Sequence, residues 1–364
     1  MTDSSSRTVL IMAGGTGGHV FPALAAAECL RAQGINVEWL GTRQGIESHL
    51  VPAANIPLHM IKVSGLRGKN VVTIVSSLFQ LFGAVYASIK LIATLKPVCI
   101  LGMGGFVSGP GGLAAWLSRR PLVIHEQNAV AGTTNRLLAK LADKILLGYP
   151  IELGNRKSRY IGNPVRAAIA QLASPEQRLG HRSGALHLLV LGGSLGSKPI
   201  NDVVPYGVCA MSAEQRPEIW HQTGKAHDEI VNETYQQLGL KARVDAFIDD
   251  MAAAYEWADV VLCRAGALTV AELTAAGVAS VLVPLPHAID DHQTENARWL
   301  VENNAGLMLP QQLLTPAALS AQLSELASDR QYLLTMSIAA RALAKVDAAE
   351  QVAATCMEVA CGES

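Results

Sequence analysis

One local pattern recurs along this chain: a short apolar stretch ends in a glycine-rich or polar turn, and a segment with helical character follows. In the first half the apolar stretches are 8–13 (TVLIMA), 36–41 (NVEWLG), 98–105 (VCILGMGG), 121–128 (PLVIHEQN) and 144–150 (KILLGYP). Strands that alternate with helices form βαβ units, in which the strands pair in parallel and helices cover both faces of the sheet. The sequence therefore predicts an α/β fold with a doubly wound parallel sheet.

The same pattern begins again in the second half, with strand candidates at 187–194, 218–224, 242–248, 259–266 and 279–285. The segment between the halves, 150–166, has the proline, glycine and charged composition of an interdomain connection. A length of 364 residues suits two domains of roughly 150 residues each. Two doubly wound domains are expected to hold a ligand in the cleft between them, at the carboxyl ends of the strands.

The composition argues against a general nucleic-acid-binding protein, because 29 basic and 30 acidic residues leave a formal net charge of -1. The six cysteines are scattered and form no CxxC pair, so we expect buried thiols in a reducing cytosol. The apolar run near the amino terminus is too short for a signal peptide.

An uncharged segment at 71–89 is almost long enough to span a bilayer. Polar residues such as Thr73, Gln80 and Ser88 interrupt it, and its apolar residues follow the stripe of an amphipathic helix. A spanning helix would also place the glycine-rich turns on either side of it in different compartments. We therefore expect an amphipathic helix that does not cross the membrane.

Three glycine-rich turns follow predicted strands, at 14–19 (GGTGGH), 102–112 (GMGGFVSGPGG) and 192–197 (GGSLGS). Glycine lets the backbone approach a ligand closely, and the helix that follows aims its N–H groups at negative charge. One such turn is more often a tight connection without a ligand, but three in one chain favour phosphate or sugar binding. The GxGxxG pattern fails, since Val20 and Val107 occupy the third glycine position, and the P-loop pattern fails as well. A sugar nucleotide, which carries a diphosphate, remains a good fit.

His19 directly follows the first glycine turn, and an imidazole can accept a proton from a hydroxyl near neutral pH. A lone histidine is nevertheless more often structural or solvated than catalytic. The polar stretch 125–128 (HEQN) ends a predicted strand, where either a satisfied hydrogen-bond cluster or a set of substrate contacts is expected. The residues alone leave both alternatives open.

The chain closely resembles the MurG family of undecaprenyldiphospho-muramoylpentapeptide β-N-acetylglucosaminyltransferases, in motifs that cover nearly its whole length. In order, these are AGGTGGHVFPALA, SGLRGK, GMGGFVSGPGG, HEQN, GNPVR, GGSLGS, FIDDMAAAY, ADVVLCRAGALTVAE and DHQTENA. The resemblance implies a GT-B fold, with two Rossmann-like doubly wound parallel-sheet domains and an interdomain cleft. Residues 1–164 would bind acceptor and membrane, with a final helix at 345–364 packing back on them, and residues 165–344 would bind UDP-GlcNAc. The implied reaction is inverting transfer of N-acetylglucosamine from UDP-GlcNAc to the C4 hydroxyl of the muramoyl sugar of lipid I, which gives lipid II.

The resemblance places the sugar-nucleotide donor on the second domain. Glu272 would accept hydrogen bonds from the two ribose hydroxyls, because a carboxylate is a pure acceptor, and Ile248 would meet the uracil edge through its backbone. Arg166 and Ser194 would hold the diphosphate. The other implied donor contacts are Ala267, Leu268, Thr269, Gln293 and Asn296. Without the resemblance, Glu272 would be taken for an ordinary first-turn carboxylate.

The resemblance places the acceptor on the first domain. Thr16, Gly17 and Gly18 would cradle the lipid diphosphate, and Asn128 and Glu126 would contact one of the sugars. His19 is the favoured catalytic base, and Glu126 is its rival.

We expect no metal cofactor, because the sequence has no Asp-x-Asp triplet of the kind that metal-dependent transferases commonly use. A helix amino terminus and Arg166 would instead stabilise the leaving diphosphate.

The resemblance also implies a membrane-facing patch of Val75, Leu78, Phe79, Phe82 and Trp116, ringed by Arg67, Lys69 and Lys140. Apolar burial and attraction to anionic lipid would hold a peripheral protein at the cytoplasmic face of the bacterial inner membrane. A core helix with a polar outer face is the alternative.

The expected partners are UDP-GlcNAc, lipid I, an anionic membrane surface and other cell-wall synthesis proteins, with no nucleic acid. Two rival functions remain. One is another UDP-sugar enzyme, either a transferase with a different acceptor or a UDP-GlcNAc 2-epimerase, and the other is a non-catalytic membrane scaffold.

Overall fold

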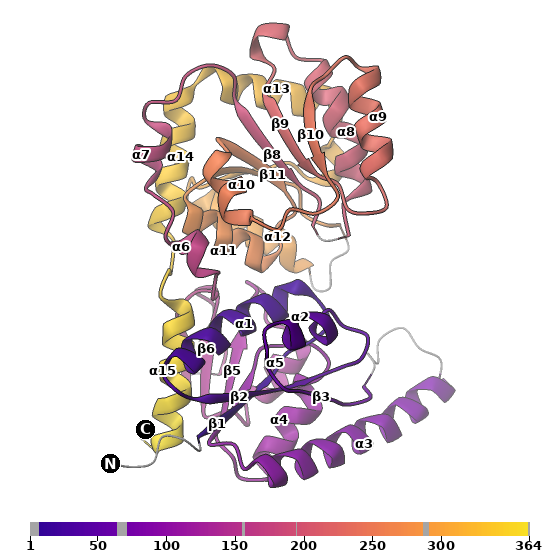
Figure 1. The fold of residues 1–364 in the computed structure, drawn as a ribbon, viewed down its shortest axis with the longest axis vertical. Coiled ribbons are helices and arrows are strands. Elements are labelled where there is room, and N and C mark those ends of the chain that lie inside the picture. Colours follow the sequence, from indigo (N-terminus) through magenta and orange to yellow (C-terminus); the bar gives the residue numbers. More distant parts are fainter. Residues whose placement is uncertain (1–6, 64–70, 155–156, 194, 287–290, 363–364) are drawn as a thin grey trace. The chain divides into compact units, whose positions relative to one another are not determined.

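The computed structural model describes residues 7–63, 71–154, 157–193, 195–286 and 291–362. The chain divides into two compact units (Figure 1). Unit 1 comprises Met1–Arg166 together with Lys345–Ser364, and unit 2 comprises Ala167–Ala344.

In the described part of unit 1, seven parallel strands form one sheet in the order β3-β2-β1-β4-β5-β6-β7. The strands are β1 (Thr8–Met12), β2 (Asn36–Gly41), β3 (Leu58–Met60), β4 (Cys99–Gly102), β5 (Leu122–Glu126), β6 (Lys144–Leu147) and β7 (Ser158–Tyr160). The helices are α1 (Gly17–Ala32), α2 (Glu47–Ala53), α3 (Val71–Leu95), α4 (Ser108–Leu117), α5 (Thr133–Leu138) and α15 (Ala348–Cys361).

The sheet of unit 1 is buried on both faces, which explains why its strands are continuous apolar runs. On β1, Val9 and Ile11 belong to a core shared with α1 and α15, whereas Leu10 and Met12 belong to a core shared with α3 and α4. The last helix, α15, therefore packs in unit 1 although it follows unit 2 in the chain. It lies beside α1, with Val352 fully buried in the shared core (Figure 1).

In the described part of unit 2, six parallel strands form a second sheet in the order β10-β9-β8-β11-β12-β13. The strands are β8 (His187–Leu191), β9 (Glu218–Gln222), β10 (Ala242–Asp245), β11 (Val260–Cys263), β12 (Ala279–Leu282) and β13 (Leu307–Met308). The helices are α6 (Ala167–Ala170), α7 (Pro175–Leu179), α8 (Lys198–Cys209), α9 (Asp228–Gln237), α10 (Met251–Trp257), α11 (Ala267–Ala276), α12 (His292–Glu302), α13 (Pro316–Ser328) and α14 (Arg330–Ala342). The described residues of unit 2 also form the 3-10 turns η3 (Ala213–Gln215) and η5 (Gln311–Leu313).

These two parallel sheets confirm the predicted α/β class with two Rossmann-like units. Three edge strands, β3, β7 and β13, were missing from the strand candidates because each has only two or three residues and none is fully buried.

The uncharged segment forms the helix α3, which packs against α4. Within the described residues, no helix combines the length and the apolar character that crossing a bilayer requires. The predicted apolar stripe is not buried along its whole length: Val85 faces the core, whereas Phe82 is exposed.

Candidate functional site

Each sheet reverses its strand order at one point, between β1 and β4 in unit 1 and between β8 and β11 in unit 2. Doubly wound folds bind ligands at the carboxyl ends of the strands beside such a point. The turns 14–19 and 102–112 follow β1 and β4, and the turn 192–197 follows β8. All three glycine-rich turns thus lie where ligands are expected, two on unit 1 and one on unit 2.

The two glycine-rich turns of unit 1 pack directly against each other. A Cβ on Gly105 would lie 2.2 Å from the carbonyl oxygen of Gly14, and Gly105 has a φ of +82°. Glycine is therefore required at Gly105 for both space and backbone conformation. Next to this contact, α1 begins at Gly17 without a side-chain cap and without an acidic residue in its first turn. The N–H groups in the first turn of a helix have no carbonyl partner within that helix. Thr16, which is exposed, lies directly before this first turn of α1.

His19 lies in the first turn of α1, and the neighbouring turn fixes its ring. Its Nδ1 is 3.1 Å from Oε1 of Gln127, whose Nε2 donates to the carbonyls of Met103 and His125. Because the amide oxygen only accepts, Nδ1 of His19 donates this hydrogen bond, and in the neutral ring Nε2 then carries the lone pair. A Cβ on Gly104 would lie 2.5 Å from Nδ1, so glycine at this position leaves the space that the imidazole fills.

Glu126, the rival candidate base, is only 2% exposed and its carboxylate is surrounded by donors. Oε1 accepts from the N–H and the side-chain amide of Asn128, at 3.0 and 3.3 Å. Oε2 accepts from the N–H of Gly132 and the side-chain amide of Asn135, at 3.0 and 2.8 Å. This carboxylate holds the segment after β5 in place and binds Asn128, and a sugar contact by either residue stays a prediction.

His125 is fully buried, and burial lowers its pKa from 6.5 to about 4. Its neutral ring donates from Nε2 to the carbonyl of Gly162 at 2.9 Å. In the stretch 125–128, His125 and Gln127 are buried and hydrogen-bonded within the fold, whereas Asn128 is partly exposed, and a substrate contact by Asn128 stays a prediction.

Glu47 is a buried residue that the sequence reasoning missed. Its carboxylate has no exposure and accepts from the N–H of Gly15 at 2.9 Å, and from the N–H and hydroxyl of Thr42 at 2.9 and 2.7 Å. A Cβ on Gly14 or Gly45 would approach its oxygens to 2.5 or 1.9 Å. Glu47 thus holds the first glycine turn in place through Gly15. Gly14 and Gly45 leave the space that its carboxylate fills.

The glycine-rich turn of unit 2 is held by the strand ends beside it. Ser194 lies outside the described residues. The N–H of Gly192 donates to the carbonyl of Gln222 at 3.2 Å, and a Cβ on Gly196 would lie 1.9 Å from the carbonyl oxygen of Thr223. The turn therefore depends on close approach to the backbone at the end of β9, and approach to a ligand stays a prediction.

Ile248 is buried in the segment after β10, and its N–H donates to Oε1 of Gln222 at 3.0 Å. Arg166, the last residue of unit 1, places its guanidinium carbon 5.7 Å from the centre of the Phe21 ring on α1.

Helix α11 begins at Ala267 with Gly266 as its N-cap, no side-chain cap and no acidic residue in the first turn. Leu268 and Thr269 are partly exposed there. Glu272 follows in the next turn at 5% exposure, and the hydroxyl of Tyr255 donates to its Oε2 at 3.1 Å. Glu272 is thus a buried carboxylate on α11 that a hydroxyl from α10 contacts, and it lies beyond the first turn of α11.

The two candidates on α12 have different environments. Oε1 of Gln293 accepts from the N–H of Leu285 at 2.9 Å, and Gln293 is partly exposed. Asn296 is fully buried and donates to the carbonyl of Ala265 at 3.1 Å, which ties α12 to the start of α11. A sugar contact by either residue stays a prediction.

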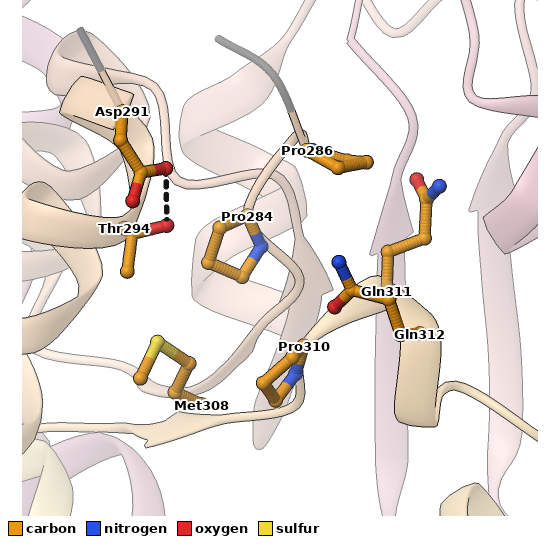
Figure 2. A pocket seen from close by; sticks show the side chains of 8 residues that line it. All are labelled: Pro284, Pro286, Asp291, Thr294, Met308, Pro310, Gln311 and Gln312. Carbon is orange, nitrogen blue, oxygen red and sulfur yellow. Dashed lines mark hydrogen bonds between the residues drawn. The ribbon is translucent and has the colours of Figure 1, made fainter.

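A pocket of about 430 Å³ lies in unit 2 at the carboxyl ends of β12 and β13 (Figure 2). Its lining is Pro284, Pro286, Asp291, Thr294, Met308, Pro310, Gln311 and Gln312. Thr294 donates to Asp291 at 2.7 Å on its wall. The sequence analysis did not predict this pocket. Its lining includes Thr294, which follows Gln293 in the chain, but none of the predicted donor residues.

Of the predicted membrane patch, Phe82 is 70% exposed and Trp116 is 51% exposed. The side chains of Val75, Leu78 and Phe79, and the residues Arg67 and Lys69, lie outside the described part. Lys140 is exposed, and further exposed apolar side chains on α3, α4 and α5 are Tyr86, Leu113, Leu117 and Leu137. The sequence reasoning did not name these four.

Within the described residues, no group of three or more His, Cys, Asp or Glu side chains is placed to hold a metal ion.

Residues 9–147 match the glycosyltransferase family 28 N-terminal domain, and residues 187–352 match its C-terminal domain. Two curated relatives carry the name UDP-N-acetylglucosamine–N-acetylmuramyl-(pentapeptide) pyrophosphoryl-undecaprenol N-acetylglucosamine transferase. The one from Cellvibrio japonicus is 55% identical over 98% of this chain and 99% of its own length. The one from Stutzerimonas stutzeri is 53% identical over 98% of this chain and 100% of its own length.

Among solved structures, Acinetobacter baumannii MurG superposes with a TM-score of 0.83 at 38% identity, over 97% of this chain and 99% of that one. A Staphylococcus aureus MnaA–UDP co-structure has a TM-score of 0.65 at 14% identity, over 95% and 94% of the two chains, and this second likeness shows the fold alone.

Proposed function

From the premise that the chain belongs to glycosyltransferase family 28, we propose that it transfers N-acetylglucosamine from UDP-GlcNAc to the C4 hydroxyl of the muramoyl sugar of lipid I, with inversion. It is an N-acetylglucosamine transferase of the group whose acceptor is N-acetylmuramyl-(pentapeptide) pyrophosphoryl-undecaprenol. The observation that carries this conclusion is 55% identity over 98% of the chain to a relative of that name.

The donor is proposed to bind unit 2 at the point where its strand order reverses. The buried carboxylate of Glu272 would accept from the two ribose hydroxyls, and Tyr255 orients it by donating to one of its oxygens. Since the N–H of Ile248 already donates to Gln222, its carbonyl oxygen is the group proposed to accept from N3–H of uracil. Ser194 and the open N–H groups of α11 at Ala267, Leu268 and Thr269 would hold the diphosphate, with Gln293 and Asn296 toward the transferred sugar.

The acceptor is proposed to bind unit 1, with its diphosphate at Thr16, Gly17 and Gly18. The first N–H groups of α1 and the dipole of this 16-residue helix favour an anion there. Asn128 would contact an acceptor sugar beside these turns.

We assign the base to His19 and not to Glu126. The lone pair on Nε2 of His19 takes the proton from the C4 hydroxyl as its oxygen attacks the anomeric carbon, and the bond to UDP breaks on the opposite side. Each oxygen of Glu126 already accepts two hydrogen bonds, so proton transfer to it would leave buried donors facing a neutral acid.

The leaving UDP carries the charge that develops as the glycosidic bond breaks. We propose that the N terminus of α11 and Arg166 stabilise it, without an obligatory protein-bound metal. Full turnover in EDTA supports this proposal, and activity that returns only with Mg²⁺ contradicts it.

Membrane attachment is proposed to use the exposed apolar side chains of α3 and α4, above all Phe82 and Trp116, with cations such as Lys140 beside them. Such a surface binds anionic lipid without crossing it. This would place the enzyme as a peripheral protein at the cytoplasmic face of the inner membrane, near its lipid-linked acceptor and other cell-wall synthesis proteins.

The proposed reaction is tested by mixing the protein with UDP-GlcNAc and a short-chain lipid I analogue. We expect UDP release and a disaccharide product that appear only when both substrates are present. Conversion of UDP-GlcNAc to its C2 epimer in the absence of the lipid I analogue would indicate an epimerase. Binding of UDP-GlcNAc with no turnover on the lipid I analogue would indicate a non-catalytic scaffold.

A further inference from the structure

Gln222 ends the strand β9, between the two segments proposed to hold the donor. Its strand pairs with β8 on one side and β10 on the other, and the register places Gln222 opposite Leu191 and Asp245. The turn 192–197 follows β8, and the segment with Ile248 follows β10. The parallel register thus places Gln222 between the turn proposed to hold the diphosphate and the segment proposed to contact uracil.

The side chain of Gln222 joins these two segments. Its Nε2 donates to the carbonyl of Gly193 at 3.0 Å, and its Oε1 accepts from the N–H of Ile248 at 3.0 Å. The backbone reinforces both links, because Gly192 donates to the carbonyl of Gln222 and Thr223 donates to the carbonyl of Asp245.

The chemistry of this bridge requires a glutamine. One end must donate to a carbonyl and the other must accept from an N–H, and the side-chain amide does both. Gln222 is only 5% exposed and Ile248 only 4%, so losing the acceptor for the N–H of Ile248 would leave a buried donor unsatisfied. The carbonyl of Gly193 belongs to an exposed residue and also accepts from the N–H of Gly196, so it would lose one of two hydrogen bonds. Glutamate keeps the acceptor but lacks the donor, methionine keeps the length but lacks both, and asparagine is shorter by one methylene.

We propose that Gln222 is a positioning residue for the sugar-nucleotide donor, which fixes the diphosphate turn and the uracil segment relative to each other by bridging Gly193 and Ile248. This role rests on the proposed function. Gln222 does not itself touch the reacting atoms. It holds two binding segments at one spacing, so that a uridine diphosphate meets both without reordering them.

The first test replaces Gln222 by methionine and measures binding of UDP by calorimetry and KM for both substrates. We expect Kd for UDP and KM for UDP-GlcNAc to rise roughly 10- to 100-fold, because the two hydrogen bonds that join the segments are lost and the buried N–H of Ile248 loses its acceptor. KM for the lipid I analogue should stay within about twofold of the parent, because its proposed site lies on unit 1. Gln215→Met is the matched control, since it removes a partly exposed amide that donates to Ser328 in the same unit.

The second test uses Gln222→Glu and compares UDP with uridine, which lacks the diphosphate. The acceptor to Ile248 remains, so uridine should bind about as well as to the parent, whereas UDP should bind roughly 10-fold more weakly. Protonation gives the carboxyl a donor for Gly193. The UDP defect relative to the parent should therefore shrink as pH falls from about 8 to about 6.

Three outcomes would overturn this role: parent-like UDP binding by Gln222→Met, equal losses for UDP and uridine in Gln222→Glu at every pH, or a rise in both KM values that follows a lowered melting temperature. A parent protein that binds no UDP at all would overturn the proposed function as well. Parent-like binding in the variant alone would overturn only the role of Gln222.

Discussion

His19 shows how a catalytic assignment depends on a neighbour's hydrogen bonds. Gln127 is held by two carbonyls, so its oxygen faces the imidazole and fixes the tautomer that leaves Nε2 basic. The sequence could place His19 after a glycine turn, but it could not show which nitrogen would act. It also could not decide between His19 and Glu126, because the four donors around Glu126 come from a segment whose folding only the structure reveals.

Replacing His19 by alanine should lower kcat by roughly 10²- to 10⁴-fold, since the proton acceptor is lost. Binding of UDP should be unchanged, because its proposed site lies on unit 2. His49→Ala, which removes an exposed histidine of α2 in the same unit, serves as the control. Turnover by His19→Ala within a few-fold of the control would show that another group takes the proton.

His221, next to Gln222 on β9, makes the stability of unit 2 depend on pH. Burial lowers its pKa from 6.5 to about 3, and its ring contacts Tyr235 and Asn201 at 2.9 and 3.1 Å. The unfolded chain then binds more protons between these two pKa values. The contribution of His221 to the free energy of unfolding is thus complete above about pH 6.5. This contribution decreases as pH falls, by up to about 1.4 kcal/mol per pH unit. Urea titrations of the parent and His221→Gln should show a shallower acid slope in the variant, and parallel slopes would contradict this.

Helices α3 and α4 show why an amphipathic pattern does not reveal which face is buried. The apolar stripe of α3 includes both Val85 and Phe82, yet only Val85 faces the core. Packing against α4 decides between them, and that packing is not local in sequence. The exposed aromatic side chains are the part of this pattern that a membrane surface can use.

Phe82→Ser and Trp116→Ser should each weaken flotation with anionic lipid vesicles by roughly 10-fold, because each removes an exposed apolar side chain. The melting temperature should change little, since neither side chain is buried. Ile230→Ser, on the exposed face of α9 in unit 2, is the matched control. Equal flotation of all three variants would assign membrane attachment to another surface.

Across the whole molecule, the sequence predicted the elements whose signal is local and missed the contacts that join distant segments. Buried parallel strands such as β1 and β8 are continuous apolar runs, so the two-sheet fold could be predicted. Glu47 could not be recognised from the sequence, because its burial depends on Gly14 and Gly45 in separate segments. The bridge made by Gln222 could not be predicted, because it depends on the register of β8, β9 and β10, which aligns three segments.

Because α15 packs in unit 1, we expect unit 1 to depend on this C-terminal helix for its stability. Deleting residues 345–364 would expose the core around Val352, Ala353 and Cys356, a loss of several kcal/mol at about 25 cal/mol per Å² of apolar surface. Unit 1 should lose its cooperative melting transition, while unit 2 should still bind UDP. A truncated chain that retains transfer activity and both transitions would show that α15 is dispensable.

The account depends most on where the nucleotide binds, and a crystal structure with UDP-GlcNAc measures this directly. We expect the ribose hydroxyls at the carboxylate of Glu272, the uracil edge at the carbonyl of Ile248, and the diphosphate at the turn 192–197. Uridine bound anywhere else, for example at the turn 14–19 of unit 1, would contradict the assignment of donor and acceptor to the two units.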